Sequence, residues 1–481
     1  MALRVRGAPQ LATLSRACHI LRPHRQVTTA TGSIDVATET DLKSSSALPA
    51  SEGSVSFAPL KVAWKPRVST QKVAVEGSRL FASSNDPLKH TLDDVGKFFQ
   101  LDGSTPAFEK VFYHTGFCGD LVTERQQKLK TSAMMVRKSG VQLRDELLQL
   151  EEQGRLGNSP GSVPGMVLQG DRGVGKSMVL NYVIACMETA GWLVAVMPHA
   201  ADWTLGLGAK SLQFANEAYR VTDPNHFSDL PPELQESNLY EQPEATAHFL
   251  VSFYLSQREK LATIPVKGEE RREHYATCAM DPSKGPTLAD MLAPYVRDDR
   301  NGFAEFPIPV RPMHDLLAEL QLVTEYPTLL VIDGWNRWHY MATSCHWRSK
   351  VPLHAQQILA PSLLGENLSY GAGMARGAML CSLTYGGARQ AKIPRALRRH
   401  IPPPHDFVRP NTLPEDVRTA LRTVMPYKHS EVQAALEFYA LTGHCQNPAL
   451  DAQLRTGELG SKISMLSAGV ADDVYKLCEQ M

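Results

Sequence analysis

Short runs of apolar residues alternate with longer helical patterns in the middle of the chain. Four of these runs have the length and composition of buried strands, and they occupy residues 166–169, 192–197, 328–332 and 378–384. Residues 177–190, which follow the first run, are apolar on most sides of a helix, and the pattern ends at Gly191. Apolar strands that alternate with helices predict an α/β fold, in which helices cover both faces of a parallel sheet.

Helical patterns also flank the predicted strands. One covers residues 123–153, where leucines supply an apolar side and charged residues cover the rest. Between the second and third strands lie helical patterns at 207–219, 243–261 and 312–324, which predict a helical insertion over about residues 205–325. Two further patterns, at 412–424 and 430–443, begin with capping-box spacing and predict a helical C-terminal region over residues 401–481.

The start of the chain differs in composition from the rest. Arginines recur before the first acidic residue, Asp35, and Leu11, Leu14 and Leu21 fall on one helical stripe. An amphipathic, arginine-rich and acid-poor start is typical of a mitochondrial transit peptide, which we place at residues 1–30; the alternative is a basic disordered tail. Residues 31–83 begin with many Ser, Thr and Ala residues, which predicts a disordered or weakly ordered linker.

Composition narrows the classes of function. The 481 residues include 50 Lys and Arg and 50 Asp and Glu, so no global basic field favours the wrapping of nucleic acid. The eight cysteines lie far apart without C-x-x-C spacing, which argues against a disulfide scaffold or a zinc ribbon and favours a reducing compartment. No apolar run is long enough to span a bilayer, and we expect no membrane partner.

The sequence GDRGVGKS at residues 170–177 has the spacing of a phosphate-binding loop, or P-loop. Glycines let the backbone point several N–H groups at phosphate oxygens, and the next helix presents its N-terminus to the same anions. Lys176 would reach the β- and γ-phosphates, and the hydroxyl of Ser177 would ligate Mg²⁺. The alternative is a glycine-rich turn in another α/β fold. The predicted nucleotide-binding residues are Gly170, Asp171, Arg172, Gly173, Val174, Gly175, Lys176, Ser177 and Met178.

Asp333 ends the apolar run at 328–332, where a carboxylate would emerge at the carboxyl edge of the sheet, beside the phosphates. We predict that it ligates Mg²⁺ together with Ser177; the alternative is an aspartate that caps the Asp-Gly turn. Many P-loop ATPases of the AAA type carry a water-activating glutamate directly after this aspartate, but this chain has Gly334. The pattern therefore predicts nucleotide binding without predicting hydrolysis, and we assign no catalytic residue. The Asn-Lys-x-Asp pattern of Ras-like GTPases is absent, which leaves the base open.

Three other features bear on the site. Thr384, or Ser382, at the end of the fourth strand could sense the γ-phosphate or could be a buried hydroxyl bonded to the backbone. The basic cluster at residues 395–400 fits a solvated helix face, local contact with RNA phosphates or a phosphate-sensing arginine. The segment 135–138, just before the glycine loop, is a candidate for holding the base.

Seven motifs, in order along the chain, carry a family resemblance from about residue 84 to the end. They are DPLKHT at 86–91, MMVRKSGVQL at 134–143, GDRGVGKS at 170–177, LLVIDGWNRW at 329–338, GAMLCSLT at 377–384, YKHSEVQAALEFY at 427–439 and LSAGV at 466–470. With these motifs the chain resembles the death-associated protein 3 family, which are GTP-binding proteins of the small subunit of the mitochondrial ribosome. A link to apoptosis belongs to the name of the family and not to these residues.

The resemblance implies a P-loop domain, related to AAA-type ATPases, over residues 166–400, with an N-terminal extension and a helix at 84–165 packed on it. It implies that residues 170–177 bind GTP or GDP and that Asp333 lies near Mg²⁺. It also implies a place in the mitochondrial matrix, in the head of the small ribosomal subunit. Partners there would be small-subunit ribosomal proteins, ribosomal RNA through local basic patches, and the large subunit through a bridge.

Two functions remain open at this point. In the first, the chain is a structural ribosomal component that holds the nucleotide as a cofactor, with at most weak GTPase activity. In the second, it is an active P-loop NTPase, a switch or a remodelling enzyme of the matrix. Gly334 argues against the second, although a residue supplied by a partner would restore activity. A small-molecule kinase ranks last, because no lid pattern accompanies the loop.

Overall fold

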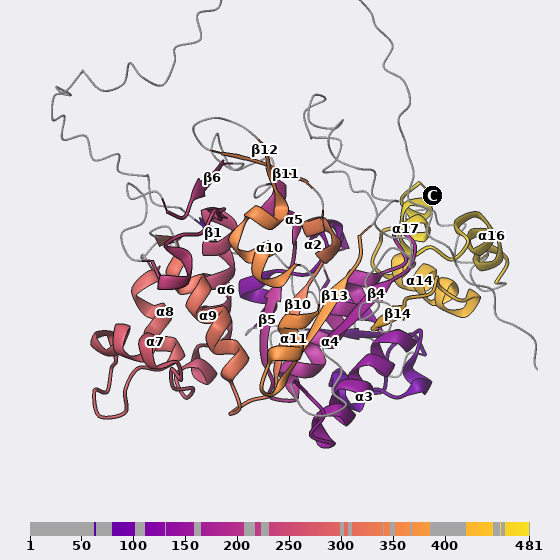
Figure 1. Cartoon of the computed structure of the whole chain (residues 1–481). Helices are drawn as coiled ribbons and strands as arrows, with labels where there is room; N and C mark the ends of the chain where they lie inside the picture. Colours follow the sequence, from indigo (N-terminus) through magenta and orange to yellow (C-terminus); the bar gives the residue numbers. More distant parts are fainter. Residues whose placement is uncertain are drawn as a thin grey trace, which may run out of the picture. The chain divides into compact units, whose positions relative to one another are not determined.

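The structure is a computed structural model, drawn in Figure 1. It describes residues 62–63, 79–101, 111–129, 131–157, 165–205, 217–222, 230–298, 303–305, 310–339, 341–346, 352–365, 368–384, 420–445, 453 and 457–480. The predicted transit peptide, most of the predicted linker and the basic cluster at 395–400 lie outside the described residues.

A five-stranded parallel sheet forms the centre of the fold (Figure 1). Its strand order is β14-β4-β13-β10-β5, and every neighbouring pair is parallel. The strands are β4 (Gly165–Gln169), β5 (Leu193–Met197), β10 (Thr328–Ile332), β13 (Gly377–Ser382) and β14 (Leu421–Thr423). The α/β fold and the four strands expected from the apolar runs are confirmed.

Helices cover both faces of this sheet, and each face has its own apolar core. The covering helices are α3 (Lys138–Glu152), α4 (Lys176–Thr189), α6 (Pro243–Leu261), α8 (Leu288–Leu292), α9 (Val310–Leu322), α10 (Leu359–Leu364) and α11 (Ser369–Gly373). Val194 and Leu329 pack with α3 and α4 on one face, because successive side chains of a strand point to opposite faces. The next residues, Ala195 and Leu330, pack with α6, α8 and α9 on the other face.

The segment between β5 and β10 supplies α6, α8 and α9, which cover the second face of the sheet. Besides α6, α8 and α9, this segment contains α5 (Ala201–Leu205), α7 (Glu269–His274), β6 (Glu217–Arg220), β7 (Tyr240–Glu241), β8 (Arg297–Asp298) and β9 (Phe303–Glu305). The expected helices at 243–261 and 312–324 are present as α6 and α9. The helix expected at 207–219 is wrong at residues 217–219, which form β6; residues 207–216 lie outside the described residues.

Partners distant in sequence explain why β6 is a strand. It pairs with β7 and, in parallel, with β11 (Met341–His346), which in turn pairs with β12 (Pro352–His354). Its backbone groups are therefore satisfied by a sheet, which the local helical periodicity does not reveal. A further short strand, β1 (Val62–Ala63), pairs with β9.

The helical pattern expected over 123–153 is confirmed in two helices but is wrong at residues 133–135, which form a strand. The chain forms α1 (Tyr113–Thr115), α2 (Asp120–Leu129), β3 (Ala133–Met135) and then α3. β3 pairs antiparallel with β2 (Phe98–Gln100). It lies between two cores, since Met134 is buried with α3 and α4 whereas Met135 is buried with the C-terminal helices. Strand pairing and two-sided burial therefore override the helical pattern here.

The described part of the C-terminal region contains three helices, α14 (His429–Leu441), α16 (Glu458–Ser467) and α17 (Ala471–Glu479), as expected, whereas residues 401–419 lie outside the described residues. These helices pack on β2 and β3, where the rings of Phe98 and Phe438 stack with centroids 3.9 Å apart. Residues 421–423, expected in a helix, form β14 instead. They pair with the outer edge of β4, whose backbone N–H and C=O groups would otherwise lack partners in a sheet. Within the described part of the chain, no helix has both the length and the apolar character needed to cross a membrane.

Candidate functional site

The chain between β4 and α4 folds back sharply at three glycines. Gly170, Gly173 and Gly175 have φ values of 140°, 84° and 101°, a region that L side chains rarely adopt. Gly175 is the N-cap residue of α4, so the helix begins at Lys176. The loop therefore lies at the N-terminus of a 14-residue helix, where free N–H groups and the helix dipole favour an anion.

Lys176 lies over the loop that precedes it. Its Nζ donates to the carbonyl oxygens of Gly170 and Asp171, each at 2.8 Å. Burial lowers the pKa of Lys176 to about 8, and the nearby carboxylates of Asp333 and Asp171 partly oppose this shift. A phosphate group would offer this ammonium a stronger acceptor than the two carbonyls.

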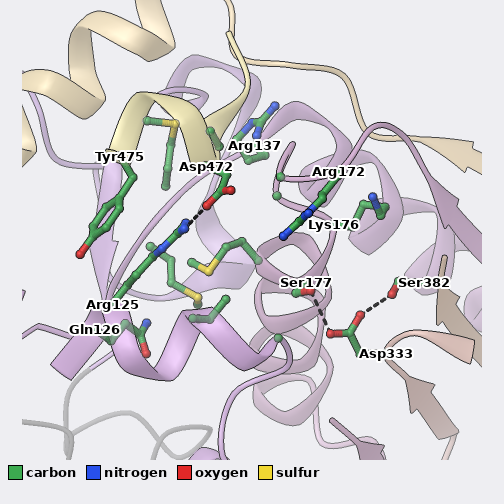
Figure 2. A pocket seen from close by; sticks show the side chains of 18 of the residues that line it. Arg125, Gln126, Arg137, Arg172, Lys176, Ser177, Asp333, Ser382, Asp472 and Tyr475 are labelled. Carbon is green, nitrogen blue, oxygen red and sulfur yellow. Dashed lines mark hydrogen bonds and ion pairs between the residues drawn. The ribbon is translucent and has the colours of Figure 1, made fainter. Parts of the chain in front are cut away.

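Ser177, Asp333 and Ser382 meet at the carboxyl edge of the sheet (Figure 2). The hydroxyl of Ser177 donates to Asp333 Oδ2 at 2.9 Å, and the hydroxyl of Ser382 donates to Asp333 Oδ1. Ser382 Oγ also accepts a hydrogen bond from the backbone N–H of Gly334 at 3.0 Å. A carboxylate and a hydroxyl are hard oxygen ligands of the kind that Mg²⁺ prefers. The two residues predicted for the metal thus lie together, and Ser382 orients one of them.

Thr384 and Gly334 lie next to this carboxylate. Gly334 has a φ of 77°, and a Cβ atom there would lie 3.4 Å from Thr384 Cγ2. A glutamate at 334 would therefore need a strained backbone beside a close neighbour. Thr384 lines the same cavity, and its backbone exchanges two hydrogen bonds, of 2.8 and 2.9 Å, with the side chain of Asn336. Of the two candidate sensors, Ser382 contacts Asp333, and Thr384 is fixed through its backbone.

The cavity that Thr384 lines has a volume of about 320 Å³ and opens beside the loop. We call the part formed by residues 172–173, 175–178, 333–334 and 382–384 the loop end. We call the part formed by Gln126, Tyr427, Phe438, Tyr439 and Tyr475 the aromatic end. In Figure 2, Ser177 and Asp333 lie on one side of the pocket, and Gln126 and Tyr475 lie on the other.

Six of the nine predicted nucleotide-binding residues line the cavity: Arg172, Gly173, Gly175, Lys176, Ser177 and Met178. The other three support the loop. The carbonyl groups of Gly170 and Asp171 hold Lys176, and Val174 is buried beneath the loop.

Arg137, from the segment considered for the base, braces the loop. Its guanidinium donates to the Val174 carbonyl at 3.1 Å, to the Met425 carbonyl at 2.7 Å and to Glu431 at 3.0 Å. It also stacks 4.4 Å from the ring centroid of Tyr427. Arg137 thereby ties the loop to α14, which forms one wall of the aromatic end.

The N-terminus of α17 rests on the loop from the other side. The backbone N–H of Asp472 donates to the Gly173 carbonyl at 3.0 Å, and its carboxylate forms an ion pair with Arg125 of α2. The guanidinium of Arg125 lies 4.4 Å from the ring centroid of Tyr475. Short motifs do not indicate these residues, because their elements are remote in sequence. The sequence gives one indication that Gln126 belongs to a site: it is a polar residue between Val122 and Leu129 on one face of α2.

The family model of mitochondrial ribosomal death-associated protein 3 matches residues 134–219 and 224–477, which include the loop, Asp333 and the C-terminal helices. No curated protein sequence matches the chain. The family model covers most of the chain and locates the protein on the ribosome of the mitochondrial matrix, in its small subunit. The chain belongs to the mitochondrial ribosomal death-associated protein 3 family.

Proposed function

We propose that this ribosomal protein binds a guanine nucleotide, GTP or GDP, together with Mg²⁺ at the loop end, and hydrolyses it slowly or not at all. The observation that carries the proposal is the hydrogen-bonded row of Ser177, Asp333 and Ser382 beside Lys176 and the N-terminus of α4. Phosphates, a lysine and two metal-ligating oxygens have complementary charge and geometry. The strand order, with β13 between β4 and β10, fits the expected relation to AAA-type ATPases.

The residues of the loop end have distinct roles in this proposal. Backbone N–H groups of residues 173–177 and the ammonium of Lys176 hold the phosphates. Ser177 and Asp333 would hold Mg²⁺, which neutralises phosphate charge when bound, and Ser382 keeps the Asp333 carboxylate in place. Guanine is proposed from the family to which the chain belongs.

The state of the carboxylates supports slow or absent hydrolysis. Among the described residues, two carboxylates line the cavity: Asp333, bonded to both serines, and Asp472, paired with Arg125 and Lys476. Neither is available to activate water, and Gly334 supplies no side chain. A nucleotide that is held without turnover stabilises the native state by mass action. We therefore propose a structural cofactor that maintains the protein in its ribosomal position.

The proposed partners are other proteins of the small subunit, with some contact to ribosomal RNA and a contribution to a bridge with the large subunit. A formal net charge of zero favours protein contacts over extensive binding of RNA. Leu441, Met465 and Leu466 at the ends of α14 and α16 are 46%, 84% and 72% exposed. Exposed apolar side chains of this kind support a protein partner on the C-terminal helices.

The test is to isolate mitochondrial ribosomes that contain the protein, extract the bound nucleotide and follow its turnover. We expect a stoichiometric guanine nucleotide that persists through purification. Ribosomes that carry Lys176→Ala serve as the control for nucleotide bound elsewhere. Several turnovers per minute at this site would favour the active NTPase, and recovery of an adenine nucleotide would overturn the assignment of the base.

A further inference from the structure

The side-chain amide of Gln126 is buried at the aromatic end without a hydrogen-bond partner. The residue is 4% exposed, and neither Nε2 nor Oε1 is bonded within the described part of the chain. The hydroxyl of Tyr475, a residue that is 3% exposed, has no partner there either. Buried polar groups in proteins are bonded in the great majority of cases. Two such side chains on one cavity therefore indicate a polar ligand.

A second buried glutamine shows what a structural role requires. Gln257 in α6 donates from Nε2 to Glu188 at 2.9 Å and accepts from Lys260 at 3.1 Å, so its amide is satisfied at both ends. Gln126 has the same burial without these partners. It lies on the cavity face of α2 with Val122 and Leu129, so its amide faces the cavity and not a protein core.

We propose that Gln126 reads the hydrogen-bonding edge of the nucleobase, with the hydroxyl of Tyr475 as a second contact. This rests on the proposed function, because the loop end must hold the phosphates for a base to enter the aromatic end. An amide places an N–H donor beside a carbonyl acceptor. Guanine presents the O6 acceptor beside the N1–H donor, so the two groups form a pair of parallel hydrogen bonds.

The walls of the aromatic end suit a flat ring. Tyr427, Phe438, Tyr439 and Tyr475 line it, and bases stack on aromatic side chains of any of these types. The ring of Tyr475 is fixed by Arg125, by a stack with His444 whose centroid lies 4.2 Å away, and by an edge contact with Tyr439 at 5.6 Å, so its hydroxyl is the part proposed to contact the base. Gln126 lies outside the residues that the family model matches, so its role follows from the cavity alone.

The experiment measures binding of GDP, ADP and inorganic tripolyphosphate to the full-length protein in Mg²⁺. Tripolyphosphate has no base and reports the loop end alone. We expect Gln126→Leu to weaken GDP binding by about tenfold or more, the effect of losing a bidentate base contact. Tripolyphosphate binding should not change. The melting temperature without ligand should stay equal or rise, because leucine removes two unbonded buried atoms.

Two further variants make the result specific. Gln257→Leu breaks a satisfied amide, so it should lower the melting temperature and leave GDP affinity unchanged. Gln126→Glu keeps the shape but replaces the donor by an acceptor that suits the N1–H and N2–H groups of guanine. It should raise the ratio of GDP to ADP affinity, and it provides the same test if the leucine variant does not fold.

The outcomes separate the two proposals. If the wild-type protein binds neither GDP nor tripolyphosphate, the proposed function fails and this inference fails with it. If the wild type binds both but neither Gln126 variant changes GDP affinity or the GDP-to-ADP ratio, only the base-reading role is overturned. Equal weakening of GDP and tripolyphosphate by Gln126→Leu would also overturn it, because the effect would then be structural.

Discussion

The loop end of the cavity is built from one continuous stretch of chain and two strand ends, whereas the aromatic end collects side chains from α2, α14, α17 and the segment before α14. At the loop end, three glycines and the first turn of α4 set the geometry through the backbone. At the aromatic end, each side chain is placed by packing between distant elements, such as the stack of Phe98 on Phe438. The proposed recognition of phosphate thus depends on local sequence, and the proposed recognition of the base depends on tertiary packing.

α17 joins the two ends, because it contacts the loop through Asp472 and lines the aromatic end through Tyr475. The two ends should therefore differ in their response to local changes and share their response to changes in α17. Three predictions test this, in order of decreasing effect.

The largest effect is expected from Lys176→Ala. Loss of the ammonium should weaken GDP and tripolyphosphate alike by about 100-fold, or about 2–3 kcal/mol, the range for hydrogen bonds to charged groups. Titration calorimetry with both ligands measures this. Lys260→Ala is the matched control, since it removes a partly buried lysine paired with Glu188 at 3.0 Å and should lower stability without changing affinity. Unequal losses for the two ligands would show that Lys176 does not act at the loop end alone.

The second prediction concerns pH. The pKa of Lys176 is about 8 in the free protein, so above this pH a phosphate ligand reaches its full affinity only when the lysine regains its proton. Affinity for tripolyphosphate should fall as pH rises through about 8, by up to about tenfold per pH unit, and be level just below it. Measurement at successive pH values shows the slope, which should be absent in Lys176→Ala. A slope that persists in that variant would assign the proton to another group.

The same lysine affects the stability of the ligand-free protein in the opposite direction. Its pKa is 10.5 in the reference state and about 8 in the fold. The unfolded chain therefore binds more protons between these values, and this group makes the folded state more stable as pH rises through that window. A fall in tripolyphosphate affinity together with a rise in the free energy of unfolding, as pH increases above about 8, would support the burial of Lys176.

The smallest effect is expected from Gly173→Ala, which perturbs the junction of the two ends. Gly173 has a φ of 84°, and a Cβ atom there would lie 2.5 Å from the Cβ atom of Asp472. Gly191→Ala is the matched control, since Gly191 has a φ of 85° and no neighbour within 4 Å of such an atom. Both variants should lose about 1–2 kcal/mol of stability from backbone strain.

Only Gly173→Ala should also displace α17 and weaken binding of GDP, by a few-fold. Melting temperatures and GDP titrations of the two variants measure the difference. Equal GDP affinities would mean that α17 does not need to rest on the loop for the nucleotide to bind.

The strands of the sheet could be predicted because buried parallel strands are continuous apolar runs, and β4, β5, β10 and β13 all have this form. β3 and β14 could not, because their strand character comes from pairing with β2 and β4 and not from their own periodicity. The helical pattern of residues 123–153 is real in α2 and α3, but it does not show the three residues where strand pairing interrupts it.

The sequence by itself determined the parallel sheet, the loop at residues 170–177 and the family, because these depend on residues that are neighbours along the chain. Only the tertiary structure decided that Ser382 fixes Asp333, that α17 rests on Gly173 and that Gln126 and Tyr475 face one cavity. The physical reason is the range of the interactions. Backbone dihedral preferences and strand burial act over a few residues, whereas the aromatic end forms only when the packing of separate elements encloses it.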